Sequence, residues 1–439
     1  YVIGMGFKSF SARANVEASL NKRMRLGLNL APTYSIKDDP GVEGKDNTLH
    51  KLVTTSPVME SAPNEQGELY QTAYAWGGSG TDPLPRLEDR VSRATMYRNL
   101  ASVYYDVDII DGLKFKTSLN FDNIDNTTEG YIPSNVLRSI SGSFGTYRRQ
   151  TLVNENTLSY IKSFNDKHNL SVILGHAYNN YTMTSSSLAS AANFNNYYTQ
   201  TLPANSTGST NKLRTVLISY FGRVQYDFKE KYLLSVSVRR DGSSVFGPDR
   251  LWGNFPGASV GWRVSDEPFF KNNIGFISDF KLRASMGLSG NNGVPPYLAE
   301  QLLGSYNYSY NGTVVQGRGL SNIQNAELRW EKNVSNNYGV DFTLFNRRLM
   351  GSFDVYSKRS SDLLMNLPVA ATTGYSSYWV NIGEVLNKGW ELELNSRNLT
   401  GKFEWNTSFN LSHNANKVTN LGGQDQIEIT NSFTGDGYA

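Results

Sequence analysis

Residues 101–122 read ASVYYDVDIIDGLKFKTSLNFD, and two runs of alternating side chains meet in this stretch at Asp111-Gly112. Apolar residues take most alternate positions on both sides of this dipeptide. A period of two places successive side chains on opposite faces of a β-strand. An Asp-Gly pair between two such runs is a strong signal for a two-residue hairpin turn. The stretch therefore predicts a pair of antiparallel strands that each have one apolar face.

The same alternation recurs along the whole length of the chain. In residues 12–30, ARANVEASLNKRMRLGLNL, it resumes after a polar turn at 21–23. Segments of about ten residues match the length of a tilted membrane-spanning β-strand. Continuing the count predicts roughly fourteen strands, near residues 12–20, 24–34, 100–109, 113–122, 151–160, 168–178, 217–228, 232–240, 257–264, 280–288, 333–345, 349–358, 388–396 and 402–412.

The predicted connections between these strands fall into two populations. Most hairpin partners are joined by about 3 to 7 residues, and about 15 residues follow the ninth strand. The other connections are long, from about 16 residues at 241–256 through about 44 at 289–332 to about 65 at 35–99. Short and long connections alternate, except that the two flanking the ninth strand are nearly equal. Such alternation is typical of an outer-membrane barrel, with short periplasmic turns and long extracellular loops.

We therefore predict an all-β chain that forms about fourteen strands of an antiparallel, up-and-down transmembrane β-barrel. A bilayer offers no water to an open sheet edge, so such a sheet must close. The alternative is a soluble propeller or sandwich, in which one face of each strand packs a core. A propeller would show a repeat of about 40–45 residues, and no such repeat is visible in the sequence.

Composition narrows the functional classes. The 42 Lys plus Arg residues nearly balance the 39 Asp plus Glu residues, so no basic field favours nucleic acid as a partner. The absence of cysteine excludes disulfide scaffolds, iron–sulfur clusters and thiol nucleophiles. No apolar stretch approaches the length of about 20 residues that a membrane-spanning helix needs.

No motif in the sequence predicts catalysis, a metal site or a cofactor. Residues 257–261 match the GxSxG pattern of hydrolases, which works only where a strand turns sharply into a helix. Strand alternation continues through this motif, so Ser259 is predicted to be a strand residue that faces the lumen. The four histidines are scattered without the spacing of a metal site. We expect neither enzyme activity nor a bound cofactor.

Two sets of side chains are candidates for contact with a solute. Charged residues on the polar side of the strands would line a lumen and tune its selectivity, or would simply be solvated there. This set comprises Arg13, Glu17, Arg25, Lys114, Lys116, Asp122, Arg223, Arg239, Arg263, Lys281, Arg283, Asp341, Asp354, Glu391 and Glu393. Aromatic loop residues could stack on sugars or peptide side chains, or could pack the loops themselves. This second set comprises Tyr74, Trp76, Tyr197, Tyr198, Tyr306, Tyr308 and Tyr310.

A more specific signal lies in the middle of the chain. The segments RRDGSSVFG at 239–247, WGNFP at 252–256 and SVGWR at 259–263 follow one another. They resemble the signature of the SusC/RagA-type TonB-dependent transporters of the Bacteroidetes outer membrane, and shorter matches at 277–285, 328–332 and 387–394 support this resemblance. The signature residues are Arg240, Asp241, Gly242, Ser243, Ser244, Phe246, Gly247, Trp252, Gly253, Phe255, Pro256, Gly261, Trp262 and Arg263.

We expect this signature to have a structural role rather than to contact the cargo. A glycine, an aspartate and two serines suit an ordered turn whose side chains satisfy its own backbone. Phe246, Trp252 and Phe255 would then pack this loop onto the outer rim of the barrel.

The resemblance implies an active importer of bulky nutrients, commonly oligosaccharides or other glycans and sometimes peptides. Similar proteins have a barrel of about 22 strands with a plugged lumen, draw energy through TonB and work with a SusD-like surface lipoprotein. Residues 1–439 would then be part of one barrel domain in outer-membrane lipid, and the N-terminal plug and the C-terminal strands would lie outside the chain. A passive porin-like channel and a soluble or surface-displayed β-rich glycan-binding protein are the alternatives.

Overall fold

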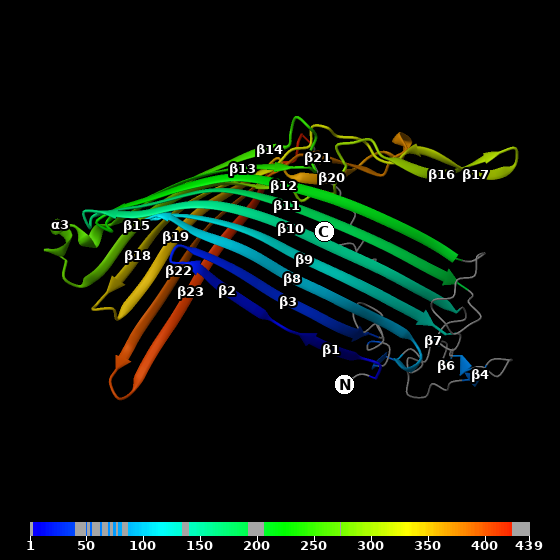
Figure 1. Cartoon of the computed structure of the whole chain (residues 1–439), viewed down its shortest axis with the longest axis horizontal. Helices are drawn as coiled ribbons and strands as arrows, with labels where there is room; N and C mark the ends of the chain where they lie inside the picture. The colour runs from blue at the N-terminus through cyan, green and yellow to red at the C-terminus, as the bar shows by residue number, and fades with distance from the viewer. Residues whose placement is uncertain are drawn as a thin grey trace. The chain divides into compact units, whose positions relative to one another are not determined.

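The computed structural model describes residues 3–39, 50, 53–54, 87–133, 140–191, 206–272 and 274–423, and the backbone of four short strands between residues 62 and 80. Its main element is one antiparallel sheet of fifteen strands (Figure 1). The all-β prediction is therefore confirmed. No helix in the described part of the chain is both long and apolar enough to cross a membrane.

Strands that are neighbours in the main sheet follow one another in the chain, apart from β2 between β1 and β3 and short separate hairpins further along. The sheet contains β1 (Gly6–Ser11), β3 (Met24–Asp38), β8 (Val91–Ile110), β9 (Leu113–Ile132), β10 (Ser141–Phe164), β11 (His168–Ala191), β12 (Ser206–Phe228), β13 (Tyr232–Ser243), β14 (Trp252–Arg263), β15 (Ile277–Asn291), β18 (Glu331–Leu344), β19 (Leu349–Ser361), β22 (Glu384–Thr400) and β23 (Glu404–Asn420), and β2 (Ala14–Asn21) also pairs with β3. Separate pairs are β4 (Ala62–Pro63) with β5 (Leu69–Tyr70), β6 (Ala73–Ala75) with β7 (Gly78–Gly80), β16 (Leu303–Tyr310) with β17 (Thr313–Leu320), and β20 (Leu364–Pro368) with β21 (Ser377–Asn381).

Each of the fourteen predicted strands corresponds to one strand of the sheet, and β1 is an addition that the sequence count missed. The predicted lengths are wrong for several strands, because β10 and β11 each have 24 residues rather than about ten. The predicted loops at 35–99 and 241–256 are too long for the same reason, since β8 begins at Val91 and β14 begins at Trp252. Where a strand extends beyond a bilayer, water reaches both of its faces. Its end then lacks the alternation that identifies a strand in the sequence.

The chain forms two compact units, and each is described by itself. Unit 1 comprises residues 1–105, 118–154 and 179–214, and unit 2 comprises residues 106–117, 155–178 and 215–439. In unit 2 the tight turns after β18 and β22 and the short helix α3 (Pro268–Lys271) lie at one end of the strands, which we call the turn end (Figure 1). The β16–β17 and β20–β21 hairpins lie at the other end, which we call the loop end. One connection is an exception, because 264–276 at the turn end is longer than 244–251 at the loop end.

The strand register sorts the side chains of unit 2 onto two faces. Two adjacent rows of the apolar face run through Tyr232, Trp262, Leu282, Val340, Phe353, Leu392 and Leu411, and through Leu234, Val260, Ala284, Tyr338, Val355, Trp390 and His413. A row of the polar face runs through Ser235, Ser259, Ser285, Asn337, Tyr356, Gly389 and Asn414.

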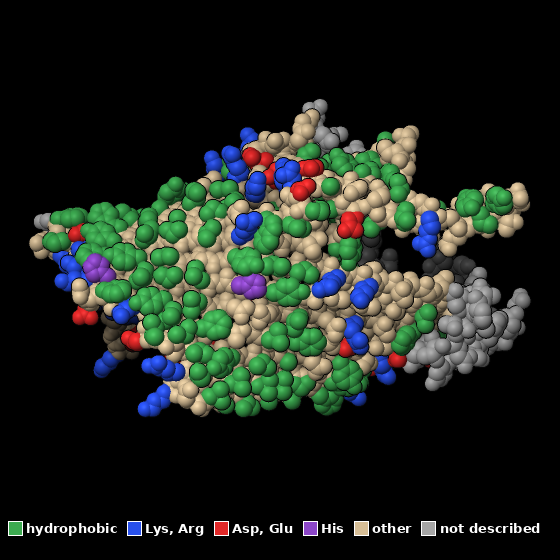
Figure 2. All heavy atoms as spheres, turned by 45° about the horizontal axis from the view of Figure 1, so that its top comes forward, with side chains coloured by type: hydrophobic (Ala, Val, Ile, Leu, Met, Phe, Trp, Pro, Cys, Tyr) green, Lys and Arg blue, Asp and Glu red, His purple; other side chains and the backbone are tan. Residues whose placement is uncertain are grey.

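Large apolar side chains on the apolar face are open to their surroundings. Val260 is 53% exposed, Met286 58% and Tyr338 62%. Figure 2 shows hydrophobic side chains gathered across the face that it presents, with most charged side chains toward its margins. A contiguous exposed patch of this kind marks a surface that meets a membrane or a partner. The apolar face is therefore suited to lipid rather than to water.

Candidate functional site

The polar face of unit 2 offers hydroxyl and amide groups to a solute. A hollow of about 670 Å³ is lined by Ser235, Ser259, Ser285 and Asn337 from neighbouring strands. Ser259, which lies within the GxSxG pattern, continues strand β14 and belongs to this row. Within the described residues, no group of three or more His, Asp or Glu side chains could hold a metal ion.

Predicted lumen charges meet at the turn side of this row. Arg283 donates from Nη2 to Asp354 Oδ2 at 2.8 Å and from Nε to Asp341 Oδ1 at 2.9 Å. Lys281 Nζ lies 3.9 Å from Asp341 Oδ2. Gly339 makes this arrangement possible, because a Cβ there would lie 2.6 Å from both Arg283 Cζ and Asp354 Oδ1. The polar face therefore presents a fixed guanidinium between two carboxylates.

Signature residues at the loop end of unit 2 take part in a buried cluster. Phe246 and Phe255 are 3% and 8% exposed, and their rings lie 5.4 and 5.3 Å from the Trp330 ring. Val245, Val294 and Leu328 complete this cluster. Trp330 Nε1 also donates to the Leu251 carbonyl at 2.9 Å. The cluster packs the signature loop against residues 326–330.

Polar signature residues attach this loop to its neighbours. Arg239 donates from Nε to both carboxylate oxygens of Asp241 at 2.8 Å. The Ser243 hydroxyl accepts from Asn292 Nδ2 at 2.9 Å, and the Ser244 hydroxyl accepts from the Val216 N–H at 2.8 Å. These two serines therefore bond residues outside their own turn.

The remaining signature residues are spread over both ends of the strands. Trp252 is 41% exposed and lies 5.0 Å from the Arg240 guanidinium, so it is outside the buried cluster. A Cβ at Gly242 would lie 2.9 Å from the Trp252 ring, one at Gly253 would lie 2.5 Å from the Phe255 ring, and one at Gly247 would lie 2.6 Å from the Ala326 carbonyl oxygen. Pro256 and Gly261 lie within β14.

Trp262 and Arg263 lie instead at the turn end. Trp262 Nε1 and the Tyr232 hydroxyl both donate to Glu267 Oε1, at 3.1 and 2.6 Å. These hydrogen bonds, with that of Tyr232 the stronger influence, hold the pKa of the Glu267 carboxyl below its ordinary value. Arg263 Nε lies 3.6 Å from Asp279 Oδ1. The signature thus fixes the strands at both ends.

A second set of hydrogen bonds joins the other loop-end segments. The Asn381 side chain accepts from the Arg329 N–H at 2.9 Å and donates to the carbonyls of Arg329 and Asp362 at 2.8 and 2.9 Å. Arg329 Nη2 donates to Asp362 Oδ1 at 2.9 Å, and Lys332 Nζ lies 3.3 Å from Asp362 Oδ2. The hydrogen bond from Arg329 lowers the pKa of the Asp362 carboxyl.

The sequence analysis missed several residues that join the loop-end segments. Val294, Asp362 and Asn381 lie in no motif. The signature contains Phe246 and Phe255, and the match at 328–332 contains Leu328 and Trp330, so these two segments are the signals that could have identified part of the cluster.

The structure describes the side chains of only some of the candidate loop aromatics. Tyr306, Tyr308 and Tyr310 lie on one face of β16 and are 50%, 55% and 63% exposed. A Cβ at Gly317 or Gly319 would lie about 3 Å from the Tyr308 or Tyr306 ring, so these rings cover glycines of the paired strand. Tyr74 lies in β6, and its side chain is outside the described part of the structure. Trp76, Tyr197 and Tyr198 also lie outside the described residues.

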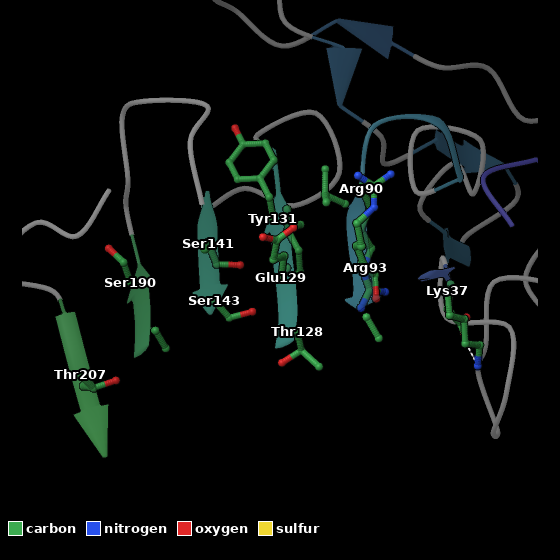
Figure 3. A pocket seen from close by; sticks show the side chains of 18 residues that line it. Lys37, Arg90, Arg93, Thr128, Glu129, Tyr131, Ser141, Ser143, Ser190 and Thr207 are labelled. Carbon is green, nitrogen blue, oxygen red and sulfur yellow. Dashed lines mark ion pairs between the residues drawn. The ribbon is translucent and has the colours of Figure 1, made fainter. Parts of the chain in front are cut away.

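Unit 1 has a hollow of about 750 Å³ that the sequence analysis did not predict (Figure 3). Its lining includes Lys37, Glu129, Ser141 and Ser190, all of which the sequence assigned to loops. Lys37 Nζ lies 2.7 Å from Asp39 Oδ2. Ser190 is 4% exposed, and its hydroxyl has no hydrogen-bond partner. This hollow therefore combines charged side chains with a buried hydroxyl group that has no hydrogen-bond partner among the described residues.

Comparison with known proteins identifies the architecture. Residues 21–438 match the family model described as TonB dependent receptor-like, beta-barrel. The chain belongs to this family. It is 34% identical over 438 residues to the TonB-dependent receptor P39 of Formosa agariphila, covering 97% of this chain and 41% of that relative. It is also 33% identical over 224 residues to the TonB-dependent receptor SusC of Bacteroides thetaiotaomicron, covering 49% of this chain and 22% of SusC.

Comparison with solved structures gives the same fold as the family match. The RagAB peptide transporter superposes with a TM-score of 0.82 at 24% identity, covering 95% of this chain and 47% of that chain. The family consists of outer-membrane β-barrel transporters, so the predicted barrel, its outer-membrane location and the resemblance to SusC/RagA-type proteins are confirmed. The soluble alternatives are thereby excluded. The chain spans less than half the length of these relatives.

Proposed function

We propose that this chain is part of the barrel wall of an active importer of bulky, polar nutrients such as oligosaccharides or peptides. Residues 1–439 would belong to one barrel domain, and a plug and further strands would lie outside them. TonB would act on the plug, and this wall would guide the released cargo. The proposal rests on the relatives named TonB-dependent receptor and SusC and on the structural likeness to a peptide transporter.

The observation that carries the proposal is the division of unit 2 into two faces. An exposed apolar face suits lipid, whereas the opposite face carries rows of serine and asparagine and a hollow of about 670 Å³. Hydroxyl and amide groups can exchange hydrogen bonds with passing sugars or peptide groups. Charges of both signs, including Lys281, Arg283 and Asp227, line the same hollow. Such a wall suits a polar, hydrogen-bonding cargo rather than a cargo of one charge sign.

The loop end would support capture of the cargo. Loops 244–251, 292–330 and 362–383 are joined by the buried cluster and by the hydrogen bonds of Asn381. We propose that this rigid rim seats a SusD-like lipoprotein and that the exposed tyrosines of β16 contact the cargo. Because a rigid seat is already ordered, binding costs less conformational entropy than it would with mobile loops.

Uptake by cells tests the proposal. The gene for the whole protein would be deleted, and the import of fluorescent oligosaccharides and peptides of graded size would be measured with and without complementation. We expect complementation to restore the import of at least one cargo class, and we expect a protonophore or the loss of TonB to abolish that import. Import that persists without TonB would instead establish the passive channel. No change for any cargo after deletion would refute the proposal.

A further inference from the structure

The apolar face of unit 2 also carries a group of basic side chains, which contact with lipid tails does not explain. Arg359 and Lys417 are the cross-strand partners of Leu386 on either side, and Lys388 lies two residues from Leu386 along β22. Neighbouring strands are about 4.8 Å apart and residues two positions apart are separated by about 7 Å. The three side chains therefore project from one small area of the same face. We call these three residues the outward basic cluster.

On β19, β22 and β23 the cluster lies beyond the apolar side chains of the same face, on the side of the loops. Trp390 and His413 are cross-strand partners with ring centroids 6.4 Å apart, and Lys388 is two residues closer to the loop end than Trp390. Amphipathic rings mark the level of lipid headgroups. Basic residues on the lipid face are costly at the middle of the bilayer and tolerated near its interface. Because loops of outer-membrane barrels face outward, the cluster lies at the headgroup level of the outer leaflet.

Within the described residues, the charge of the cluster is balanced only in part. Arg359 Nε lies 3.6 Å from Glu384 Oε1, with the Arg359 side chain 59% exposed. Within the described residues, Lys388 and Lys417 form no ion pair, and both are exposed. An anion outside the chain could therefore contact two lysines and an arginine together.

We propose that the outward basic cluster binds the phosphate groups of an outer-leaflet glycolipid, whose acyl chains lie on the apolar face below it. Two features favour a lipid over a soluble anion. The cluster is continuous with exposed apolar side chains, including Val355 at 44% and Leu411 at 48% exposure. It also lies on the face opposite the polar row, so a solute in the lumen cannot reach it. Arginine and lysine side chains donate charge-assisted hydrogen bonds to phosphate oxygens.

The test uses the whole protein, purified in neutral detergent and freed of lipid. Binding of bisphosphorylated lipid A would be measured by native mass spectrometry for the wild type and for the double variant Lys388→Gln/Lys417→Gln. A basic residue near an anionic lipid surface contributes about fivefold in binding, so we expect the affinity of the double variant to fall about 25-fold. Lipid A without phosphates should bind the wild type at least as weakly as bisphosphorylated lipid A binds the variant, because the variant keeps Arg359.

The matched control removes two lysine or arginine charges from the opposite face. Lys358 and Arg223 are exposed and lie on the polar face, and Lys358 neighbours Arg359 in the chain. Lys358→Gln/Arg223→Gln should change the affinity less than twofold, and both double variants should keep heat-modifiable migration. Unchanged binding by Lys388→Gln/Lys417→Gln would overturn the proposal. An equal loss in the control, or equally tight binding of phosphate-free lipid A, would also overturn it.

Discussion

Replacing Trp330 by alanine should release the signature loop from its support. Trp330 is 6% exposed, its ring contacts Phe246 and Phe255, and its Nε1 donates to the Leu251 carbonyl. Truncation of a buried tryptophan costs about 3–5 kcal/mol, and loss of the hydrogen bond adds about 1 kcal/mol. The local free energy of opening of 244–251 should therefore fall by at least about 3 kcal/mol, which corresponds to more than 100-fold.

Hydrogen exchange of the whole protein measures this local opening, because exchange of loop amides tracks the free energy of the opening that exposes them. The matched control is Trp252→Ala, since Trp252 lies in the same region but is 41% exposed, lies outside the buried cluster and has the Arg240 guanidinium over its ring. An exposed cation–π contact contributes about 1 kcal/mol or less, so exchange in 244–251 should accelerate by no more than about fivefold. Equal acceleration in the two variants would refute the assignment of the cluster as the support of the loop.

Three further predictions concern the wall, the rim and the hairpin. Gly339→Ala should lower the yield of heat-modifiable whole protein by disturbing Arg283 and its carboxylates, at a cost of roughly 1–3 kcal/mol, whereas Gly287→Ala should be tolerated because no atom lies within 4 Å of its Cβ position. The depressed pKa of Asp362 means that its contribution to rim stability is complete above the ordinary aspartate pKa of about 3.9 and is lost as the pH falls through the lower folded-state value. Hydrogen exchange of 362–383 between pH 7 and pH 2, corrected for intrinsic rates, should show this acid loss in the wild type and not in Asp362→Asn. Replacing Tyr306, Tyr308 and Tyr310 by serine should weaken cargo binding at least tenfold in a binding assay. The control places alanine at Ser305, Asn307 and Ser309, on the other face of β16, and should leave cargo binding unchanged. Equal effects of the two triple variants would contradict a specific role for the tyrosines.

The sequence predicted the parts of the fold that a bilayer constrains. Leu282 and Ala284 alternate with Lys281 and Arg283 because lipid lies on one side of β15 and water on the other, and this contrast defines the strand. The turn at Asp111-Gly112 was predictable for a local reason, since Gly112 has a φ of +82° that other residues rarely adopt. The strand positions could therefore be predicted from the polarity of each residue and from the conformation that a turn glycine allows.

The same reasoning failed where both faces of a strand meet water. The ends of β10 and β11 carry no alternation, so the sequence assigned them to loops. The site was only partly predictable, because contacts such as Trp330 with Phe255 and Asn381 with Arg329 join segments that are distant in the chain. The charges Arg283, Asp341 and Asp354 were predicted to face the lumen individually, but their mutual pairing depends on register and on the space that Gly339 leaves.

Thiol labelling along β15 tests the central claim most directly, because residues 1–439 contain no cysteine. The whole protein without an added cysteine gives the background rate. Ala284→Cys, Ser285→Cys and Met286→Cys would be made in the whole protein, and each would be treated with a small charged thiol reagent in intact outer membranes. Ser285 lies on the polar face, and its two neighbours lie on the apolar face. If the polar face lines an aqueous lumen and the apolar face meets lipid, only the cysteine at position 285 reacts rapidly. Equal reaction rates at all three positions would contradict a barrel wall with one wet face and one lipid face.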